Sequence, residues 1–311
     1  MERRRRQPRR RPAPDRGSKR GTLAAFPGDF MTSHADSLSA RDMDRLCRLI
    51  YEQSGIRLST GKRIMLEGRL RRRMAKLQLA SYREYCDYLF DGGHDAEEMV
   101  LLIDAVTTNK TDFFRERAHF DFLQAKVLPE LGQRGGRELF VWSAGCSTGE
   151  EPYTLAIVLA EHQLAHPGFH FRLLATDIST GVLEKAGKGV FHSDVVRPVA
   201  VELQRKYFMR SRDPGSDLMR VVPELRAKVE FRRLNLMEDF GFSDRADAIF
   251  CRNVVIYFDR PTQERLFQRM CRQLVDGGYI FVGHSESLHH MDLPLVPVAP
   301  ALYRKSDGQR N

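Results

Sequence analysis

Hydrophobic residues recur at helical spacing in the first patterned part of the chain. Met43, Leu46 and Ile50 lie on one face behind Ser39, a suitable N-cap, and Gly55 is a suitable stop. A second helix is predicted over residues 62–79, because Leu66, Leu70, Met74 and Leu77 cluster on one face at about 100° per residue. Residues 81–90 and 96–107 are also helical in pattern. Because no strand-like alternation occurs here, we predict a small all-helical domain over residues 35–107.

The pattern changes after Asn109 to short apolar runs that alternate with helical segments. This arrangement is typical of a parallel sheet covered by helices on both faces. Strands are predicted at residues 138–143, 172–176, 229–232, 248–251, 279–282 and 301–305. Residues 191–228 interrupt the alternation over a length that exceeds a simple connection, so we expect them to form an inserted subdomain. We therefore predict an α/β domain over residues 108–311.

Length and composition narrow the class of protein. A chain of 311 residues with 42% hydrophobic content agrees with about two domains. No apolar run is long enough to cross a membrane, and the arginine block at the start lacks the apolar stretch of a secretory signal. The five cysteines include no C-x-x-C pair, which argues against a disulfide framework or a zinc ribbon. We therefore expect a soluble, cytoplasmic protein with free thiols.

The net charge of +9 lies almost entirely at the start of the chain. Residues 1–20 carry ten Lys or Arg against Glu2 and Asp15, which leaves the rest close to neutral. This Arg- and Pro-rich segment has almost no apolar side chains, so residues 1–34 are predicted to be a disordered tail. We consider three interpretations of this tail: it binds polyanions or anionic lipid weakly, it is a solvated extension, or it results from a mis-assigned start codon. A specific nucleic-acid partner is not expected.

Residues 139–153 contain a strand, a glycine-bearing turn and the start of a helix. Such a turn at the carboxyl end of a strand is where open α/β sheets bind ligands, and Gly145 and Gly149 allow close approach to the backbone. The segment is neither a P-loop nor a full G-x-G-x-x-G motif. Glu150 and Glu151 would repel a pyrophosphate but suit a ligand with hydroxyls and a positive charge. S-adenosylmethionine carries both, although a purely structural turn would look similar.

Asp177 follows the second predicted strand and lies at the same edge of the sheet. A carboxylate in this position can accept hydrogen bonds from ribose hydroxyls. A lone Asp after a strand is also a common helix N-cap. The ribose interpretation is favoured because Asp177 comes after the glycine turn in the order expected for a nucleoside site.

Four longer motifs carry a family resemblance. Thr108–Glu116 (TNKTDFFRE), the Ser143–Tyr153 turn, Ala248–Phe258 (AIFCRNVVIYF) and Gly283–Ser287 (GHSES) resemble the CheR family of chemotaxis receptor methyltransferases. The similarity runs from about residue 37 to residue 305. It implies an α/β fold, namely a Rossmann-like S-adenosylmethionine-dependent methyltransferase domain with a small antiparallel β insert at 191–228, preceded by the all-helical domain. The implied reaction methylates glutamate side chains of methyl-accepting chemotaxis receptors, giving methyl esters and S-adenosylhomocysteine for sensory adaptation.

The resemblance also implies roles for individual residues. Residues implied to bind the cofactor are Asn109, Thr111, Arg115, Glu151, Asp177, Asn235, Leu236, Arg252 and Asn253. Asp177 would hold the ribose, Asn235 and Leu236 would border the adenine, and Arg115 and Tyr257 would be the catalytic residues near the methyl group. The alternatives are a surface ion pair of Arg115 with Glu116 or Asp112, and a core aromatic role for Tyr257.

The implied chemistry needs few residues. A glutamate side chain has a pKa of about 4.3 and is already a nucleophilic carboxylate at neutral pH. Its attack on the sulfonium methyl therefore requires no general base. A metal is not expected, because His284 and Glu286 lack a third ligand at suitable spacing. We expect these two residues to make structural hydrogen bonds, and His289 and His290 to form an exposed loop pair.

Receptor docking is predicted on a basic stripe of the second helix. The stripe consists of Lys62, Arg69, Arg73 and Lys76. A solvated helix face is the alternative, since surface charges are individually worth little. The resemblance further suggests that the β insert binds a receptor C-terminal peptide by strand addition, near residues 210–220. We expect a monomer recruited to membrane receptor arrays. A methyltransferase with another acceptor and a non-catalytic cofactor-binding module are the competing hypotheses.

Overall fold

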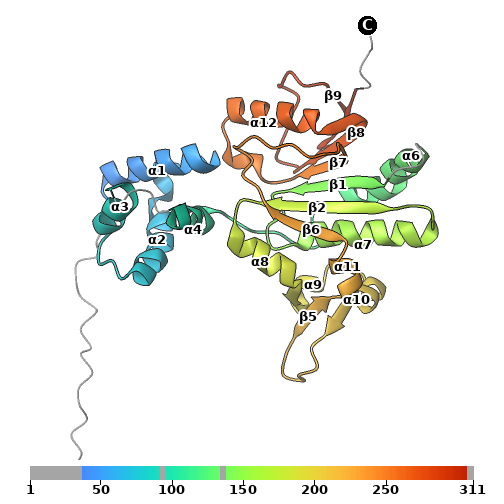
Figure 1. The fold of residues 1–311 in the computed structure, drawn as a ribbon, viewed down its shortest axis with the longest axis horizontal. Helices are drawn as coiled ribbons and strands as arrows, with labels where there is room; N and C mark the ends of the chain where they lie inside the picture. Colours follow the sequence, from blue (N-terminus) through green and yellow to red (C-terminus); the bar gives the residue numbers. More distant parts are fainter. Residues whose placement is uncertain (1–36, 92–95, 134–137, 307–311) are drawn as a thin grey trace, which may run out of the picture. The chain divides into compact units, whose positions relative to one another are not determined.

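The computed structural model describes residues 37–91, 96–133 and 138–306 (Figure 1). The predicted disordered tail at residues 1–34 lies outside this range. No helix in the described part is long and apolar enough to cross a membrane.

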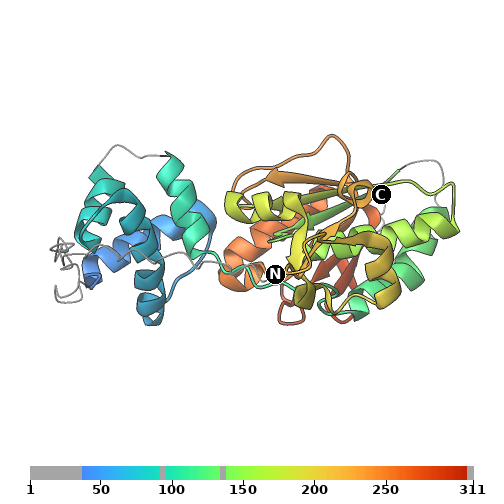
Figure 2. The same cartoon turned by 90° about the horizontal axis from the view of Figure 1, so that it is seen from below.

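The described chain begins with a group of helices packed around a core of their own (Figure 2). Its elements are α1 (Ala40–Ser54), η1 (Thr60–Lys62), α2 (Arg63–Leu77), α3 (Tyr82–Asp91) and α4 (Ala96–Val106). The Ser39 hydroxyl accepts a hydrogen bond from the Asp42 backbone N–H at 3.0 Å, and Gly55 ends α1 with a φ of 73°. Leu46, Ile50 and Leu66 are fully buried. The predicted helices and their caps are therefore confirmed.

A seven-stranded mixed sheet follows, with strand order β6-β2-β1-β7-β8-β10-β9. Its strands are β1 (Leu139–Ala144), β2 (Phe171–Asp177), β6 (Val229–Arg233), β7 (Ala246–Cys251), β8 (Leu274–Val282), β9 (Leu295–Ala299) and β10 (Leu302–Lys305). The first five in spatial order pair in parallel, whereas β10 is antiparallel to β8 and to β9. All six predicted strands are present, and the edge strand β9 was not predicted.

Both faces of the sheet are buried, as the apolar runs predicted. Along β1, Val141 packs in the cluster that contains Leu155 of α7 (Glu150–Ala165), and Trp142 in the cluster that contains Phe267 of α12 (Arg260–Arg272). Figure 1 shows α7 and α8 (Thr180–Lys188) on one side of the sheet and α12 on the other. The segment α5 (Ala118–Phe122), η2 (Leu123–Val127) and α6 (Leu128–Gln133) leads into β1. This is a Rossmann-like arrangement.

The interruption at residues 191–228 forms a second, three-stranded antiparallel sheet of order β3-β5-β4. It contains β3 (Val190–His192), α9 (Ser193–Val196), α10 (Val201–Tyr207), β4 (Phe208–Arg210), β5 (Leu218–Val221) and α11 (Pro223–Arg226). The predicted β insert is confirmed. Because β5 is the central strand, its residues 218–220 cannot add a peptide strand, and the free edges belong to β3 and β4.

Hydrogen bonds join the helical group to the sheet. The Tyr51 hydroxyl donates to Asp259 at 2.5 Å, the Asn235 side-chain amide donates to the Gln53 carbonyl at 2.7 Å, and the Arg57 N–H donates to the Tyr257 carbonyl at 2.9 Å. The Asp104 carboxylate accepts from Thr180 and Gly181 at the start of α8. These contacts hold the end of α1 and of α4 beside the loops that follow β2, β6 and β7.

The prediction of an exposed basic stripe on α2 is wrong for Arg73. Its side chain is buried and forms an ion pair with Glu98, whose carboxylate also accepts from Tyr85 at 2.8 Å. The Arg69 guanidinium is half-buried and donates to the carbonyls of Val106 and Thr107. Lys62 and Lys76 remain exposed. The four residues therefore do not form one docking face.

Candidate active site

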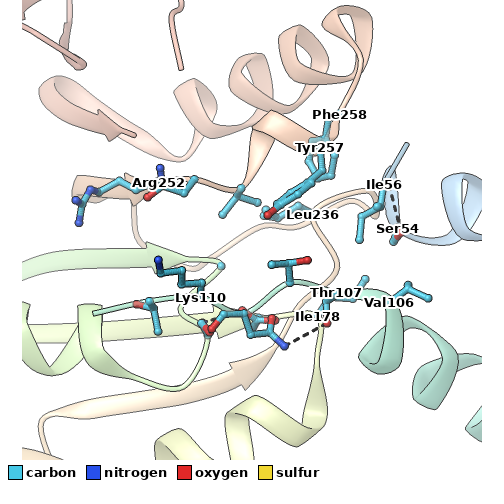
Figure 3. Close-up of a pocket in the computed structure, with 18 of the residues that line it drawn as sticks. Ser54, Ile56, Val106, Thr107, Lys110, Ile178, Leu236, Arg252, Tyr257 and Phe258 are labelled. Atoms are coloured by element: carbon cyan, nitrogen blue, oxygen red, sulfur yellow. Dashed lines mark hydrogen bonds between the residues drawn. The ribbon is translucent and has the colours of Figure 1, made fainter. Parts of the chain in front are cut away.

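A pocket of about 1100 Å³, including the part open to solvent, lies at the carboxyl ends of β1, β2 and β7. All nine residues predicted to bind the cofactor line it, and so does Tyr257. In Figure 3, Tyr257 and Leu236 lie across the pocket from Lys110, Thr107 and Ile178. The structure thus brings together residues from segments far apart in the chain. Their individual roles stay predictions.

Asp177 lies at the end of β2 beside the glycine turn. Its Oδ2 accepts from the Ser147 backbone N–H at 2.8 Å, and its Oδ1 accepts from the Ser179 N–H at 3.0 Å. Burial raises the pKa of Asp177, and these N–H donors oppose that rise. The N-cap of α8 is Ser179, so the alternative N-cap role of Asp177 is excluded. The buried carboxylate faces the pocket and can accept further hydrogen bonds there.

The two glycines of the turn serve backbone conformation and packing. Gly145 has a φ of 82°, and a Cβ there would lie 2.4 Å from a methyl group of Val254. Gly149 has a φ of 103°, and a Cβ there would lie 3.0 Å from Ala186 of α8. Protein atoms therefore fill the space that a side chain would need at both positions, while Gly145 also lines the pocket, so the expected close approach of a ligand to the backbone stays a prediction. Positive φ and tight packing are the structural reasons.

Arg252 joins two carboxylates at the edge of the pocket. Its Nη1 lies 2.9 Å from Glu151 Oε2, and its Nη2 lies 2.9 Å from Glu116 Oε2. Glu151 also accepts from the Ser143 hydroxyl at 2.7 Å. Burial alone would raise the pKa of Glu116, but the hydrogen bond and charge of Arg252 outweigh it and lower that pKa. Glu151 is thus held in place at the start of α7, where it lines the pocket.

Arg115 and Tyr257 both reach the pocket from loops. The Arg115 guanidinium donates to the Lys110 carbonyl at 2.9 Å and is half-buried. Glu116, its alternative partner, pairs with Arg252 instead. Tyr257 ends the short helix η3 (Val255–Tyr257) and is half-buried, which excludes a core aromatic role. The Lys62 ammonium lies 5.9 Å from the centre of its ring.

Glu286 shapes the loop that carries Arg252, Asn253 and Tyr257. One of its oxygens accepts from the backbone N–H groups of Asn253 and Gly283, and the other from those of Val255 and Ile256. Burial raises the pKa of Glu286, while these donors oppose the rise. The prediction of structural hydrogen bonding is confirmed for Glu286. His289 and His290 are exposed, as predicted.

Several pocket residues were not predicted. Residues of the helical group contribute to the wall, and so do two side chains within the TNKTDFFRE motif: Ser54, Ile56, Leu58, Lys62, Met65, Lys110 and Asp112. Of these, Lys62 had been singled out for docking and Asp112 as an alternative ion-pair partner of Arg115, and neither for the pocket. Lys110 and Asp112 could have been predicted to line the pocket, because they lie next to predicted cofactor residues in the sequence. The residues at the end of α1 could not, because the sequence does not show which end of a helix meets the sheet.

Two family models and several chemotaxis protein methyltransferases match this chain. Residues 109–298 match the model described as CheR methyltransferase, SAM binding domain, and residues 41–107 match the model described as CheR methyltransferase, all-alpha domain. The chain is 40% identical to chemotaxis protein methyltransferase 2 of Pseudomonas aeruginosa, over 84% of this chain and 92% of that protein. It is 37% identical to the chemotaxis protein methyltransferase of Borreliella burgdorferi (87% and 96%) and 41% identical to that of Salmonella typhimurium (82% and 86%).

Proposed function

The chain belongs to the CheR methyltransferase family, and we propose that its pocket binds S-adenosylmethionine and passes the methyl group to glutamate side chains of chemotaxis receptors. The observation that carries this proposal is the convergence of all nine predicted cofactor residues and Tyr257 on one pocket at the carboxyl edge of the sheet. The products are a glutamate methyl ester and S-adenosylhomocysteine.

The arrangement of carboxylates suits a ligand with hydroxyls at one end and a positive charge at the other. Asp177 is proposed to accept from the ribose hydroxyls, because its two oxygens already lie fixed by backbone donors. Glu151 is proposed to face the methionyl ammonium, with Arg252 near the methionyl carboxylate. Leu236 and Asn235 are proposed to border the adenine, and Ile178 lines the same wall.

Three cationic side chains, Lys62, Lys110 and Arg115, line the pocket. When bound, the sulfonium of the cofactor supplies an electrophilic methyl group. The glutamate carboxylate needs no base, so the protein's task is to hold it in line; alignment can contribute about 7–11 kcal/mol to lowering a barrier. Arg115 is proposed to orient the carboxylate through its forked N–H groups, and the Tyr257 hydroxyl to support that geometry.

We extend this proposal to the surfaces that recognise the receptor. We propose that Lys62 and Lys76, the two exposed members of the predicted stripe, contact the acidic receptor region. The free edges of β3 and β4 are proposed to accept a receptor C-terminal peptide by strand addition. The protein is proposed to act as a cytoplasmic monomer recruited to receptor arrays.

The test is transfer of labelled methyl from S-adenosylmethionine to receptor-containing membranes, scored as base-labile label released as methanol. Arg115→Ala should lose most of this label. Arg117→Ala is the matched control, since Arg117 is exposed on the same segment and should keep transfer. Cofactor binding without ester on any receptor would refute the proposed acceptor, and equal transfer by Arg115→Ala would refute the proposed role of that residue.

A further inference from the structure

His119 is a buried imidazole with an unusual environment. Only 3% of the residue is exposed, and neither Nδ1 nor Nε2 has a hydrogen-bond partner within the described residues. Burial lowers the pKa of His119, and the Pro300 backbone, which lies near the ring without reaching full hydrogen-bond geometry, acts to raise it. Buried polar groups are nearly always satisfied, and an exception often marks a missing water or ion. The cofactor pocket does not use this side chain, because His119 does not line it.

Two further groups approach His119 from different segments. Glu116 lies three residues earlier, with Oε2 3.5 Å from His119 Nδ1, and His284 follows β8, with its ring centre 5.1 Å from that of His119. One potential ligand atom from each of the three residues lies within 4.8 Å of the others. From the sequence we had paired His284 with Glu286 and found no third metal ligand at suitable spacing. In the fold, His284 meets Glu116 and His119 instead.

We propose that Glu116, His119 and His284 form a binding site for a divalent transition metal ion of the zinc class. Two imidazoles and one carboxylate are a common protein donor set for zinc with an open fourth position. Magnesium and calcium prefer all-oxygen sites and are not expected here. His284 is exposed, so an ion can enter and a water molecule can complete the coordination. This proposal revises the expectation that the protein lacks a metal site.

The distances between the candidate ligand atoms of Glu116, His119 and His284 need only a small adjustment to match a zinc site. Ligand atoms of a tetrahedral zinc site lie about 3.4 Å apart, given bonds of about 2.0–2.1 Å. Glu116 and His119 already have nearly this separation. His284 supplies the remaining movement, because its exposed ring can rotate without disturbing a packed core.

Charge also permits a cation here despite the nearby Arg252. This guanidinium lies between Glu116 and Glu151, so the three charged groups together carry a net charge of −1. Imidazole binds metal ions in its neutral form, which predominates above its ordinary pKa of about 6.5. A bound ion would compete with Arg252 for the Glu116 carboxylate.

The experiment is calorimetric titration of the untagged full chain with Zn²⁺, followed by Co²⁺ absorption spectroscopy. We expect one tight site in the wild type and in His290→Ala, an exposed histidine of the same loop that serves as the control. His284→Ala should weaken binding about tenfold or more, and it should fold because His284 is exposed. The Co²⁺ spectrum should show tetrahedral coordination without thiolate bands. Absence of a tight site, equal affinity in His284→Ala, or thiolate bands would each overturn the proposal. None of these readouts depends on methyl transfer.

Discussion

Glu116 forms an ion pair with Arg252 at 2.9 Å, and Arg252 in turn pairs with the pocket carboxylate Glu151 at 2.9 Å. The side chain of Arg252 is only 2% exposed. A guanidinium buried this deeply is stable only when its charge is compensated. Glu116 therefore supports the cofactor site without lining the pocket.

Removing Glu116 should destabilise the whole fold. Glu116→Ala leaves Arg252 paired with Glu151 alone, and losing a hydrogen bond between charged groups costs about 1.5–3 kcal/mol. Urea unfolding with a chelator present, so that bound metal does not contribute, measures this loss. The control is Glu230→Ala, which breaks an exposed pair with Arg232 and should cost at most about 1 kcal/mol. Similar losses in both variants would contradict the supporting role.

Cofactor affinity should depend on pH through Asp177. Burial raises the pKa of this carboxyl above its ordinary value. Only the ionised carboxylate accepts freely from ribose hydroxyls, so affinity should be full at neutral pH and fall as the pH drops toward the raised pKa. The decline should begin at a higher pH than the ordinary Asp pKa of about 3.9 would give.

Calorimetric binding of S-adenosylmethionine between neutral and mildly acidic pH measures this dependence. Asp177→Asn should weaken binding about 10-fold to 150-fold, because a hydrogen bond to a charged group contributes about 1.5–3 kcal/mol. It should also remove this part of the pH dependence. A wild-type affinity that stays constant down to a pH of about 4 would argue against the ribose role.

The hydroxyl of Tyr257 should act on the rate of transfer rather than on cofactor binding. Tyr257→Phe keeps the ring that lines the pocket and removes only the oxygen. We expect kcat to fall about 10-fold to 100-fold, as for loss of about 1.4–2.7 kcal/mol of transition-state stabilisation. The affinity for S-adenosylmethionine should stay within about twofold. Steady-state transfer kinetics and calorimetry separate the two effects, and a fall in affinity with unchanged kcat would assign Tyr257 to binding alone.

The strands could be predicted from local pattern, whereas most of the pocket residues were implied by the family resemblance. A short apolar run marked β1, and Asp177 ends β2 while Arg252 follows β7, two strands whose carboxyl ends lie at the same edge of the sheet. The edge strand β9 was missed because Val296, Pro297 and Val298 are all exposed and show no alternation between buried and exposed residues. The four N–H donors around Glu286 also could not be predicted, since they depend on how the loop after β7 folds back.

Arg73 and Lys76 illustrate the same limit and give the last prediction. Helical spacing placed them on one stripe, but α4 brings Glu98 against Arg73 and buries it, whereas Lys76 stays exposed. Lys76→Glu should therefore raise KM for receptor several-fold without changing unfolding or the KM for S-adenosylmethionine. Arg73→Ala should lower the unfolding free energy by about 3 kcal/mol, because it removes the buried guanidinium whose charge compensates the Glu98 carboxylate. Urea unfolding and transfer kinetics on both variants measure these effects. If Arg73→Ala stayed fully stable and raised only the receptor KM, Arg73 would belong to the docking surface after all.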